Sequence, residues 1–324
     1  MTHRVLLYAD EVIGAYGYEE KPWFLPQVRL ESFMEQVHAQ ALDQRVEICT
    51  SPMAEDADLL GFHTAAHLER IRAVCATNQG ALDEGVTLAR SHVERAASHV
   101  VGAVMDASRR IAAGDCDAAF VPIAGFHHAT TDQARLYCLY NDAAVVISWL
   151  LCQLSGKIAY IDIDVHQGDG VYESFAEQPR VVIADLHEDS STLFPHSPDC
   201  PGTGKFAGRS EARGRGPGLG TKLNIALCPY TTDELFLAHW RRAEAFIEAQ
   251  RPEWIIFVSG VDALAGDPLA NQRLTLGAIR EVTQRVRRLA ERHCEGRLLV
   301  LGGGGYCLDN VAQGWATVLD VLTS

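Results

Sequence analysis

The sequence of 324 residues predicts an α/β protein in which a mainly parallel sheet is flanked by helices. Short apolar runs alternate along the chain with longer segments in which apolar residues recur every three or four positions. Several of the short runs are continuously apolar, which is typical of strands that are covered on both faces. The β-α-β-α order of these segments indicates a parallel sheet with helical crossovers.

The predicted strands are short and bounded by polar or glycine-containing segments. They cover residues 5–8, 118–122, 158–163, 181–184, 223–227, 254–258 and 298–301. The helices predicted between them cover residues 26–42, 66–77, 92–113, 142–154, 232–250, 273–293 and 310–322. No repeat and no Pro/Ser-rich linker divides the chain, so we expect one domain over residues 1–324. Residues 187–221 are glycine-rich and lack periodicity, and loops of this length are usually functional or disordered.

Composition excludes several classes of protein. A net charge of −14 opposes the phosphate backbone, so we expect no nucleic-acid partner; the acidic surface suits cationic partners or serves solubility alone. No apolar run approaches the roughly 18 residues of a membrane span, and the N-terminus lacks the features of a signal peptide. We therefore expect a cytoplasmic protein without a membrane partner. The cysteines form no Cys-x-x-Cys pair, which argues against a zinc ribbon or a thioredoxin-like site.

Polar clusters follow four of the predicted strands at the point where each strand ends. In chain order they contain His127 and His128; Asp162, Asp164, His166 and Asp169; Asp262 and Asp267; and the glycines 302–305 before Tyr306. Taken singly, the adjacent histidines are compatible with a surface loop. Asp262 or Asp267 alone is compatible with a turn or a helix cap. In open parallel sheets, however, ligands bind beyond the carboxyl ends of the strands. We therefore expect the clusters to form one active site.

The cluster after the strand at 158–163 is the most informative. The period of a strand places Asp162, Asp164 and, if the strand continues, His166 on one face of a segment that otherwise reads as buried. Burying such groups without partners costs several kcal/mol, and a bound metal with hydrogen-bonded partners removes that cost. A structural ion-pair network is the alternative. The glycines before Tyr306 match neither a dinucleotide-binding loop nor a P-loop, but they allow a close backbone approach to a ligand.

With these motifs the sequence resembles the histone deacetylase superfamily, which includes acetylpolyamine amidohydrolases and bacterial deacetylase-like amidohydrolases. The resemblance extends from about Asp58 to Trp315. The motifs occur in family order at residues 125–129 (Gly-Phe-His-His-Ala), 137–142 (Tyr-Cys-Leu-Tyr-Asn-Asp), 160–170, 201–204 (Pro-Gly-Thr-Gly), 266–268 (Gly-Asp-Pro) and 301–306 (Leu-Gly-Gly-Gly-Gly-Tyr). The family fold is a single α/β deacetylase domain around a mainly parallel eight-stranded sheet, which agrees with the strands predicted above.

The resemblance implies a zinc-dependent deacetylase acting on an acylated lysine or an acetylated small amine. The Zn²⁺ ligands it implies are Asp164, His166 and Asp267. Three protein ligands leave a position open for water and substrate, as a catalytic zinc site requires. The other catalytic residues it implies are the general base His128 with its partner Asp169, His127 paired with Asp162, and Tyr306 as a donor to the developing oxyanion.

The resemblance also suggests how substrate is contacted, with departures in this chain. Leu136 stands where a glycine is usual, Tyr137 is the tunnel aromatic, and Cys200 replaces a phenylalanine on the opposite wall. We therefore expect an acyl channel of altered width, with Gly304 beside it. Leu274 matches the position at which polyamine-specific relatives place a glutamate gatekeeper, so we expect a preference for acyl-lysine.

A second ion and a rim contact follow from the same resemblance. A K⁺ site is expected at Asp162, Asp164, His166, Asp185 and Leu186. Asp185 takes the place of a serine hydroxyl in this set, which alters the affinity for the ion. Asp83 is a candidate for the rim aspartate that grips the substrate backbone.

Three other functions are open to a chain with these motifs. The first is an acetylpolyamine deacetylase, which the acidic net charge favours. The second is a ureohydrolase with two manganese ions, but Gly168 stands where a further aspartate ligand is needed. The third is a non-catalytic acyl-lysine-binding protein, for which we expect the loss of a ligand or of Tyr306, and neither is lost.

Overall fold

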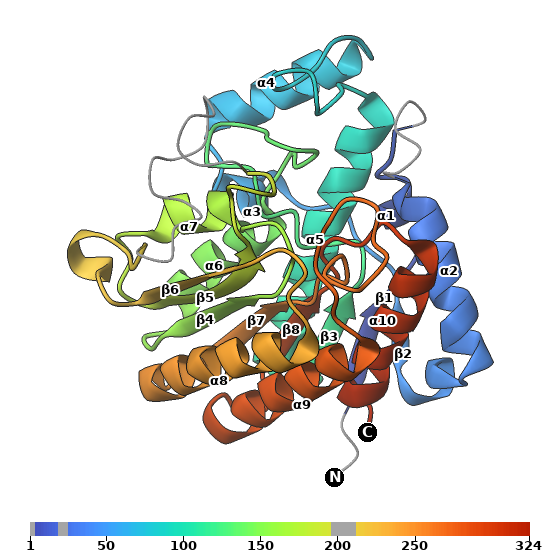
Figure 1. The fold of residues 1–324 in the computed structure, drawn as a ribbon. Helices are drawn as coiled ribbons and strands as arrows, with labels where there is room; N and C mark the ends of the chain where they lie inside the picture. The colour runs from blue at the N-terminus through green and yellow to red at the C-terminus, as the bar shows by residue number, and fades with distance from the viewer. Residues whose placement is uncertain (1–3, 19–24, 196–211) are drawn as a thin grey trace.

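The computed structural model describes residues 4–18, 25–195 and 212–324. Within these residues, eight strands form one sheet in the order β2-β1-β3-β8-β7-β4-β5-β6 (Figure 1). Their bounds are Val5–Tyr8 (β1), Glu47–Cys49 (β2), Ala118–Val121 (β3), Ile158–Asp162 (β4), Val181–Glu188 (β5), Lys222–Leu227 (β6), Trp254–Val258 (β7) and Leu298–Leu301 (β8). Every neighbouring pair is parallel, which confirms the predicted α/β fold class.

Two strands differ from the sequence prediction by more than one residue. The edge strand β2 was not predicted, because it has only three residues and most of its surface is exposed, so it leaves no apolar run. The other, β5, continues beyond residue 184 through a stretch that contains Asp185, His187 and Glu188, all of them buried. Buried polar side chains cannot be recognised from an apolar pattern, since their partners come from distant parts of the chain.

Helices cover both faces of the sheet (Figure 1). One layer contains α2 (Pro26–Ala39), α8 (Asp233–Gln250), α9 (Leu276–His293) and α10 (Leu308–Leu322), and the other contains α5 (Ser91–Ala113) and α6 (Asp142–Gln153). Shorter elements are α1 (Glu11–Gly14), α3 (Asp56–Leu60), α4 (Ala65–Ala76), α7 (Asp169–Phe175), η1 (Leu42–Arg45) and η2 (Gly216–Gly218). Among the described residues, no helix is both long and apolar enough to span a bilayer.

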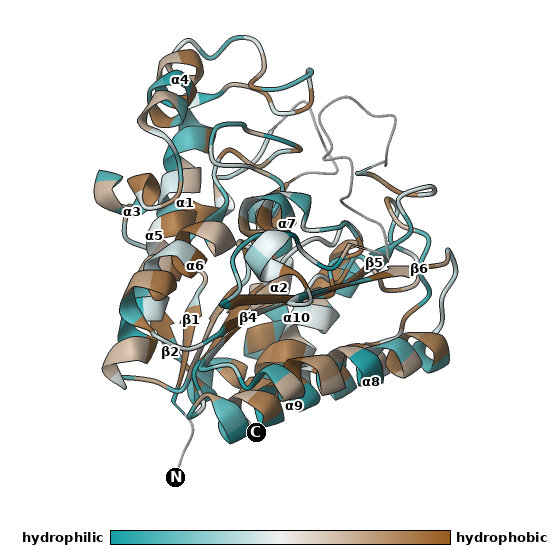
Figure 2. Cartoon of the chain, turned by 90° about the vertical axis from the view of Figure 1, so that its left-hand side faces the viewer, coloured by the Kyte–Doolittle hydropathy of each residue, from teal (hydrophilic) through white to brown (hydrophobic). Residues whose placement is uncertain are grey.

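The apolar strands lie between helices whose surfaces carry both apolar and polar residues (Figure 2). Strands β1, β3, β4, β7 and β8 are buried along their whole length. Side chains cap several of the covering helices: the side chain of Asn141 accepts a hydrogen bond from Ala144 N at 3.0 Å where α6 begins. Gly114 ends α5 with a positive φ of 77°, the left-handed conformation that favours glycine at this position.

Candidate active site

The polar clusters predicted from the sequence follow strands that are neighbours in the sheet. Strands β3, β8, β7 and β4 lie side by side in this order, and all point the same way. The loops that leave their carboxyl ends therefore meet at one edge of the sheet. A pocket of about 160 Å³ opens there, and residues from the clusters after β3, β4 and β8 line it.

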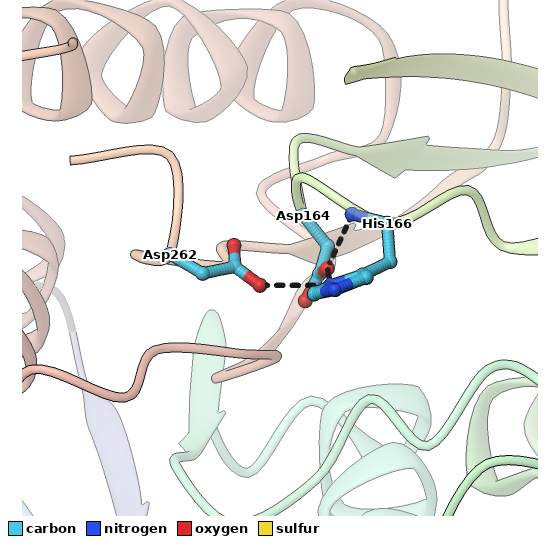
Figure 3. Close-up of side chains that lie close together, drawn as sticks. All are labelled: Asp164, His166 and Asp262. Atoms are coloured by element: carbon cyan, nitrogen blue, oxygen red, sulfur yellow. Dashed lines mark hydrogen bonds and ion pairs between the residues drawn. The ribbon is translucent and has the colours of Figure 1, made fainter. Parts of the chain in front are cut away.

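Three of these side chains form a compact group with the composition of a metal site. Asp164 and His166 follow β4, Asp262 follows β7, and one ligand atom from each lies within 4.8 Å of the others (Figure 3). His166 Nδ1 is 3.1 Å from Asp164 Oδ1 and 3.1 Å from Asp262 Oδ2. Burial opposes a charge on His166, but the two carboxylates raise its pKa to about 10. A cation bound by these three side chains would compete with the proton on His166.

Asp267, which the sequence predicted as the third ligand, is not part of this group. Its Oδ2 atom accepts hydrogen bonds from the backbone N–H groups of Tyr306 at 2.7 Å and Cys307 at 3.3 Å. Its Oδ1 atom accepts one from Leu269 N at 2.9 Å. Oδ2 of Asp267 thus fixes the loop that carries Tyr306, and Oδ1 fixes a turn within Asp267's own loop. Asp262 takes its place, with no exposed surface and with Oδ1 held by Val165 N at 3.0 Å.

The glycine-rich turn after β8 completes the group. The backbone N–H of Gly304 donates to Asp164 Oδ2 at 2.5 Å. A Cβ atom at residue 304 would lie 2.1 Å from Asp262 Oδ2, so a side chain here would displace the carboxylate. Gly303, with a φ of 67°, turns the backbone into this position. These contacts explain why glycine stands at positions 303 and 304.

His127 and His128 follow β3 and face different carboxylates. His127 Nδ1 lies 2.9 Å from Asp162 Oδ2, and His128 Nδ1 lies 2.7 Å from Asp169 Oδ1. Burial opposes a charge on His127, but the Asp162 carboxylate outweighs it and raises the pKa to about 10. Burial together with the charge on His127 lowers the pKa of His128 to about 4. At neutral pH the pair therefore consists of one imidazolium and one neutral imidazole.

The start of α6 holds the histidine loop in place. Asn141 Nδ2 donates to the backbone carbonyls of His127 at 3.1 Å and Ala129 at 2.8 Å, on either side of His128. The Asp142 carboxylate accepts from Gly125 N at 2.9 Å and Phe126 N at 3.2 Å. Residues 141–142 belong to the family motif at 137–142, from which no role for them was predicted.

The substrate-contacting residues predicted from the sequence are only partly brought together. Leu136, Tyr137 and Gly304 line the pocket. Leu274 does not: it is 2% exposed and pairs through its backbone with Leu264, so it belongs to the core rather than to the rim. Leu269, which is 39% exposed, lines the pocket instead.

Cys200, predicted for the opposite wall, lies outside the described residues. Phe194 lines the pocket, so the structure provides an aromatic side chain that sequence reasoning missed. The sequence does contain an aromatic residue near the expected place, since Phe194-Pro195 precedes the Pro-Gly-Thr-Gly motif by a few residues.

Arg29 is a further site residue that the sequence did not reveal. This side chain of α2 is 4% exposed, lines the pocket, and donates to Gly303 O at 2.7 Å. Its guanidinium lies 5.8 Å from the centroid of the Tyr306 ring and 4.8 Å from that of Trp315. An isolated arginine in a helical pattern carries no sequence signal for such a position.

The residues predicted to bind K⁺ include Asp164 and His166 of the ligand group itself, with Asp162 at the end of β4 and Asp185 and Leu186 within β5. The Asp185 carboxylate is buried; Oδ1 contacts His187 Nδ1 at 2.8 Å, and Oδ2 accepts from Gly168 N at 3.0 Å. Asp185 thus orders the segment just after His166. Binding of a monovalent ion by Asp162, Asp164, His166, Asp185 and Leu186 stays a prediction.

Residues 24–322 match the profile of the histone deacetylase domain. The chain belongs to the histone deacetylase family. Similar proteins include the acetoin utilization protein AcuC of Bacillus subtilis, 31% identical over 282 residues, covering 84% of this chain and 70% of the relative. AcuC of Staphylococcus xylosus is 29% identical over 321 residues, covering 96% of this chain and 80% of the relative. Membership of this family supports deacetylase activity.

Proposed function

We propose that the protein is a Zn²⁺-dependent deacetylase that hydrolyses the amide of an acylated lysine side chain or a related amine. The observation that carries this proposal is the group of Asp164, His166 and Asp262, of which the first two line a pocket together with His128 and Tyr306. Two carboxylates and one imidazole suit Zn²⁺, and three protein ligands leave a position open. Bound zinc supplies Lewis acidity toward the amide carbonyl and lowers the pKa of a water molecule.

The residues of the chain account for the proton transfers. Neutral His128, oriented by Asp169, accepts the proton of the attacking water and then returns it to the departing amine. His127 keeps its charge beside Asp162 and stabilises the negative charge that develops in the pocket. Burial, with the nearby carboxylate of Asp262, raises the pKa of Tyr306 well above its usual range. Tyr306 therefore remains protonated and donates a hydrogen bond to the oxyanion.

The proposal is tested by the turnover of an acetyl-lysine peptide, measured as the release of acetate. We expect hydrolysis by the purified protein, its loss on chelation and its return when zinc is added. Binding of the peptide without hydrolysis by the zinc-loaded protein would instead indicate an acyl-lysine-binding protein. Two tightly bound metals per chain would favour the chemistry of the ureohydrolases.

The substrate preference is proposed from Leu269 at the rim. A leucine offers no negative charge to the internal ammonium of an acetylpolyamine, so we expect a higher kcat/KM for an acetyl-lysine peptide than for acetylspermidine. Leu269→Glu should shift the ratio toward the polyamine by about tenfold, because a charged pair in a partly desolvated pocket contributes on the order of 1.4 kcal/mol or more.

Leu269→Gln is the matched control, since glutamine has the same length as glutamate but carries no charge. An equal shift in both variants would show that polarity rather than charge decides. If the unmodified protein already prefers acetylspermidine tenfold, the argument from Leu269 is wrong, and the acidic net charge acts through other residues.

A further inference from the structure

A tight turn in the pocket wall has an unusual backbone. Arg135 and Cys138 exchange two backbone hydrogen bonds, from Arg135 N to Cys138 O at 3.1 Å and from Cys138 N to Arg135 O at 2.8 Å. The two residues between them, Leu136 and Tyr137, have φ values of 47° and 66°. Positive φ at both central positions is the pattern of a type I′ turn, which favours Asn and Gly. A leucine and a tyrosine in this conformation are strained, and both side chains line the pocket.

Side chains from a distant loop hold this turn. The backbone N–H of Leu136 donates to Asp83 Oδ2 at 3.1 Å, and that of Tyr137 donates to Thr87 Oγ1 at 2.8 Å. The Thr87 hydroxyl in turn donates to Asp83 Oδ2 at 2.5 Å. The Tyr16 hydroxyl donates to Tyr137 O and accepts from Leu139 N at 3.1 Å. The backbone groups of the strained residues therefore have partners that fix their direction.

The carboxylate of Asp83 is fully used by these contacts. Besides Leu136 N and the Thr87 hydroxyl on Oδ2, its Oδ1 atom accepts from Val86 N at 2.9 Å and Thr87 N at 2.8 Å. A carboxylate offers about four acceptor positions, and protein groups fill all of them. Asp83 is thus poorly suited to grip the backbone of a substrate, which is the role that the sequence suggested for it.

We propose that Asp83 and Thr87 are positioning residues that clamp Leu136 and Tyr137 into the pocket wall and thereby set the affinity for substrate. The inference rests on the proposed deacetylase function, because substrate affinity is its readout. The clamp is needed because this chain has a leucine where glycine would adopt the same backbone without strain. Metal ligands and Tyr306 are not involved, so the effect should fall on KM rather than on kcat.

A double-mutant cycle tests the clamp by comparing the effect of losing Asp83 with and without the backbone strain at residue 136. Asp83→Asn, Leu136→Gly and the double variant are compared by steady-state kinetics on an acetyl-lysine peptide. Asp83→Asn should raise KM about tenfold with little change in kcat, and in the Leu136→Gly background it should raise KM less than about threefold. Equal losses in both backgrounds would overturn the proposal, because they would mean that Asp83 contacts substrate or only folds its own loop.

Thr87 provides a second route if Asp83→Asn does not fold. Thr87→Val removes the hydroxyl without a change of shape and should raise KM by about threefold or more, while Thr87→Ser should restore it. A Thr87→Val variant with an unchanged KM would contradict the clamp. If the unmodified zinc-loaded protein does not hydrolyse the peptide, the proposed function fails instead, so the two failures are distinguishable.

Discussion

At the residue scale, Asp262 and Asp267 show how neighbouring aspartates in one loop take different tasks. Asp262 faces His166, whereas Asp267 accepts two backbone hydrogen bonds from the segment carrying Tyr306 and a third from Leu269 in its own loop. One side chain therefore belongs to the ligand group, and the other supports the loop that delivers Tyr306. A carboxylate that orders a neighbouring loop influences turnover without binding the metal.

Variants of the two aspartates should differ in the amount of zinc that they bind. Asp262→Asn should lose tightly bound zinc, because it removes one of three charged or basic ligands. Asp267→Asn should retain about one zinc per chain and lose turnover through the displaced Tyr306 loop. Elemental analysis after dialysis, with kinetics on the same samples, measures both. The assignment fails if Asp262→Asn keeps its zinc while Asp267→Asn loses it.

Tyr306→Phe should leave metal content and the unfolding midpoint unchanged. Because one donor to the oxyanion is lost, kcat should fall by about a hundred- to a thousand-fold, roughly 2.7–4 kcal/mol. Steady-state kinetics and thermal unfolding of the same preparation measure the two effects. A variant with turnover within a factor of a few of the unmodified protein would refute the role of the hydroxyl.

At the element scale, the beginning of α6 joins a helix cap to the histidine loop. The Asn141 side chain accepts from Ala144 N and donates to two carbonyls on either side of His128. The amide group is needed for this arrangement because it combines an acceptor with two donors. A cap residue with an acceptor alone would serve the helix but release the loop.

Asn141→Asp tests this division. The aspartate keeps the cap but directs a carboxylate at the two carbonyls in a fully buried position. We expect unfolding in urea to show a loss of about 3 kcal/mol, since buried unsatisfied groups cost roughly 1–3 kcal/mol each and charged ones more. Turnover per folded molecule should fall as well. An Asn141→Asp variant as stable as the unmodified protein would show that the loop is held by other contacts, such as those of Asp142.

At the scale of the whole molecule, the metal group links stability to pH. In the metal-free protein the pKa of His166 is raised to about 10, above the usual value of 6.5. This pairing stabilises the metal-free fold below about pH 6.5, and the contribution is lost as the pH rises toward 10. Zinc requires neutral His166, so binding releases a proton. Zinc affinity should therefore rise with pH, by up to about tenfold per unit for each proton released.

Thermal unfolding with and without zinc at pH 6.5, 7.5 and 8.5 checks this linkage. The difference between the two unfolding midpoints should widen as the pH rises, because ligand binding stabilises the folded protein in proportion to its affinity. Calorimetric titration in buffers of different ionisation enthalpy should show at least one proton released per zinc. A midpoint difference that narrows with pH would contradict the proposed ligand state of His166.

The fold class and most of the strands follow from the sequence alone, as does the edge of the sheet at which the polar clusters meet. Continuous apolar runs such as 158–163 mark strands buried on both faces, and polar groups that directly follow such strands must meet at one edge of a parallel sheet. The family motifs can likewise be recognised in the sequence, because each of them is a short local segment. The half-exposed β2 and the polar end of β5 fell outside such patterns.

Which side chains touch depends on the path of the loops in the folded protein. Spacing along the chain did not distinguish Asp262 from Asp267, or Leu269 from Leu274, because both members of each pair follow β7 and the path of the loop sets their directions. The positive φ of Leu136 and its bond to Asp83 likewise arise between segments about fifty residues apart. Apolar periodicity is encoded locally, but the position of a side chain in a loop depends on long-range hydrogen bonds that no local pattern contains.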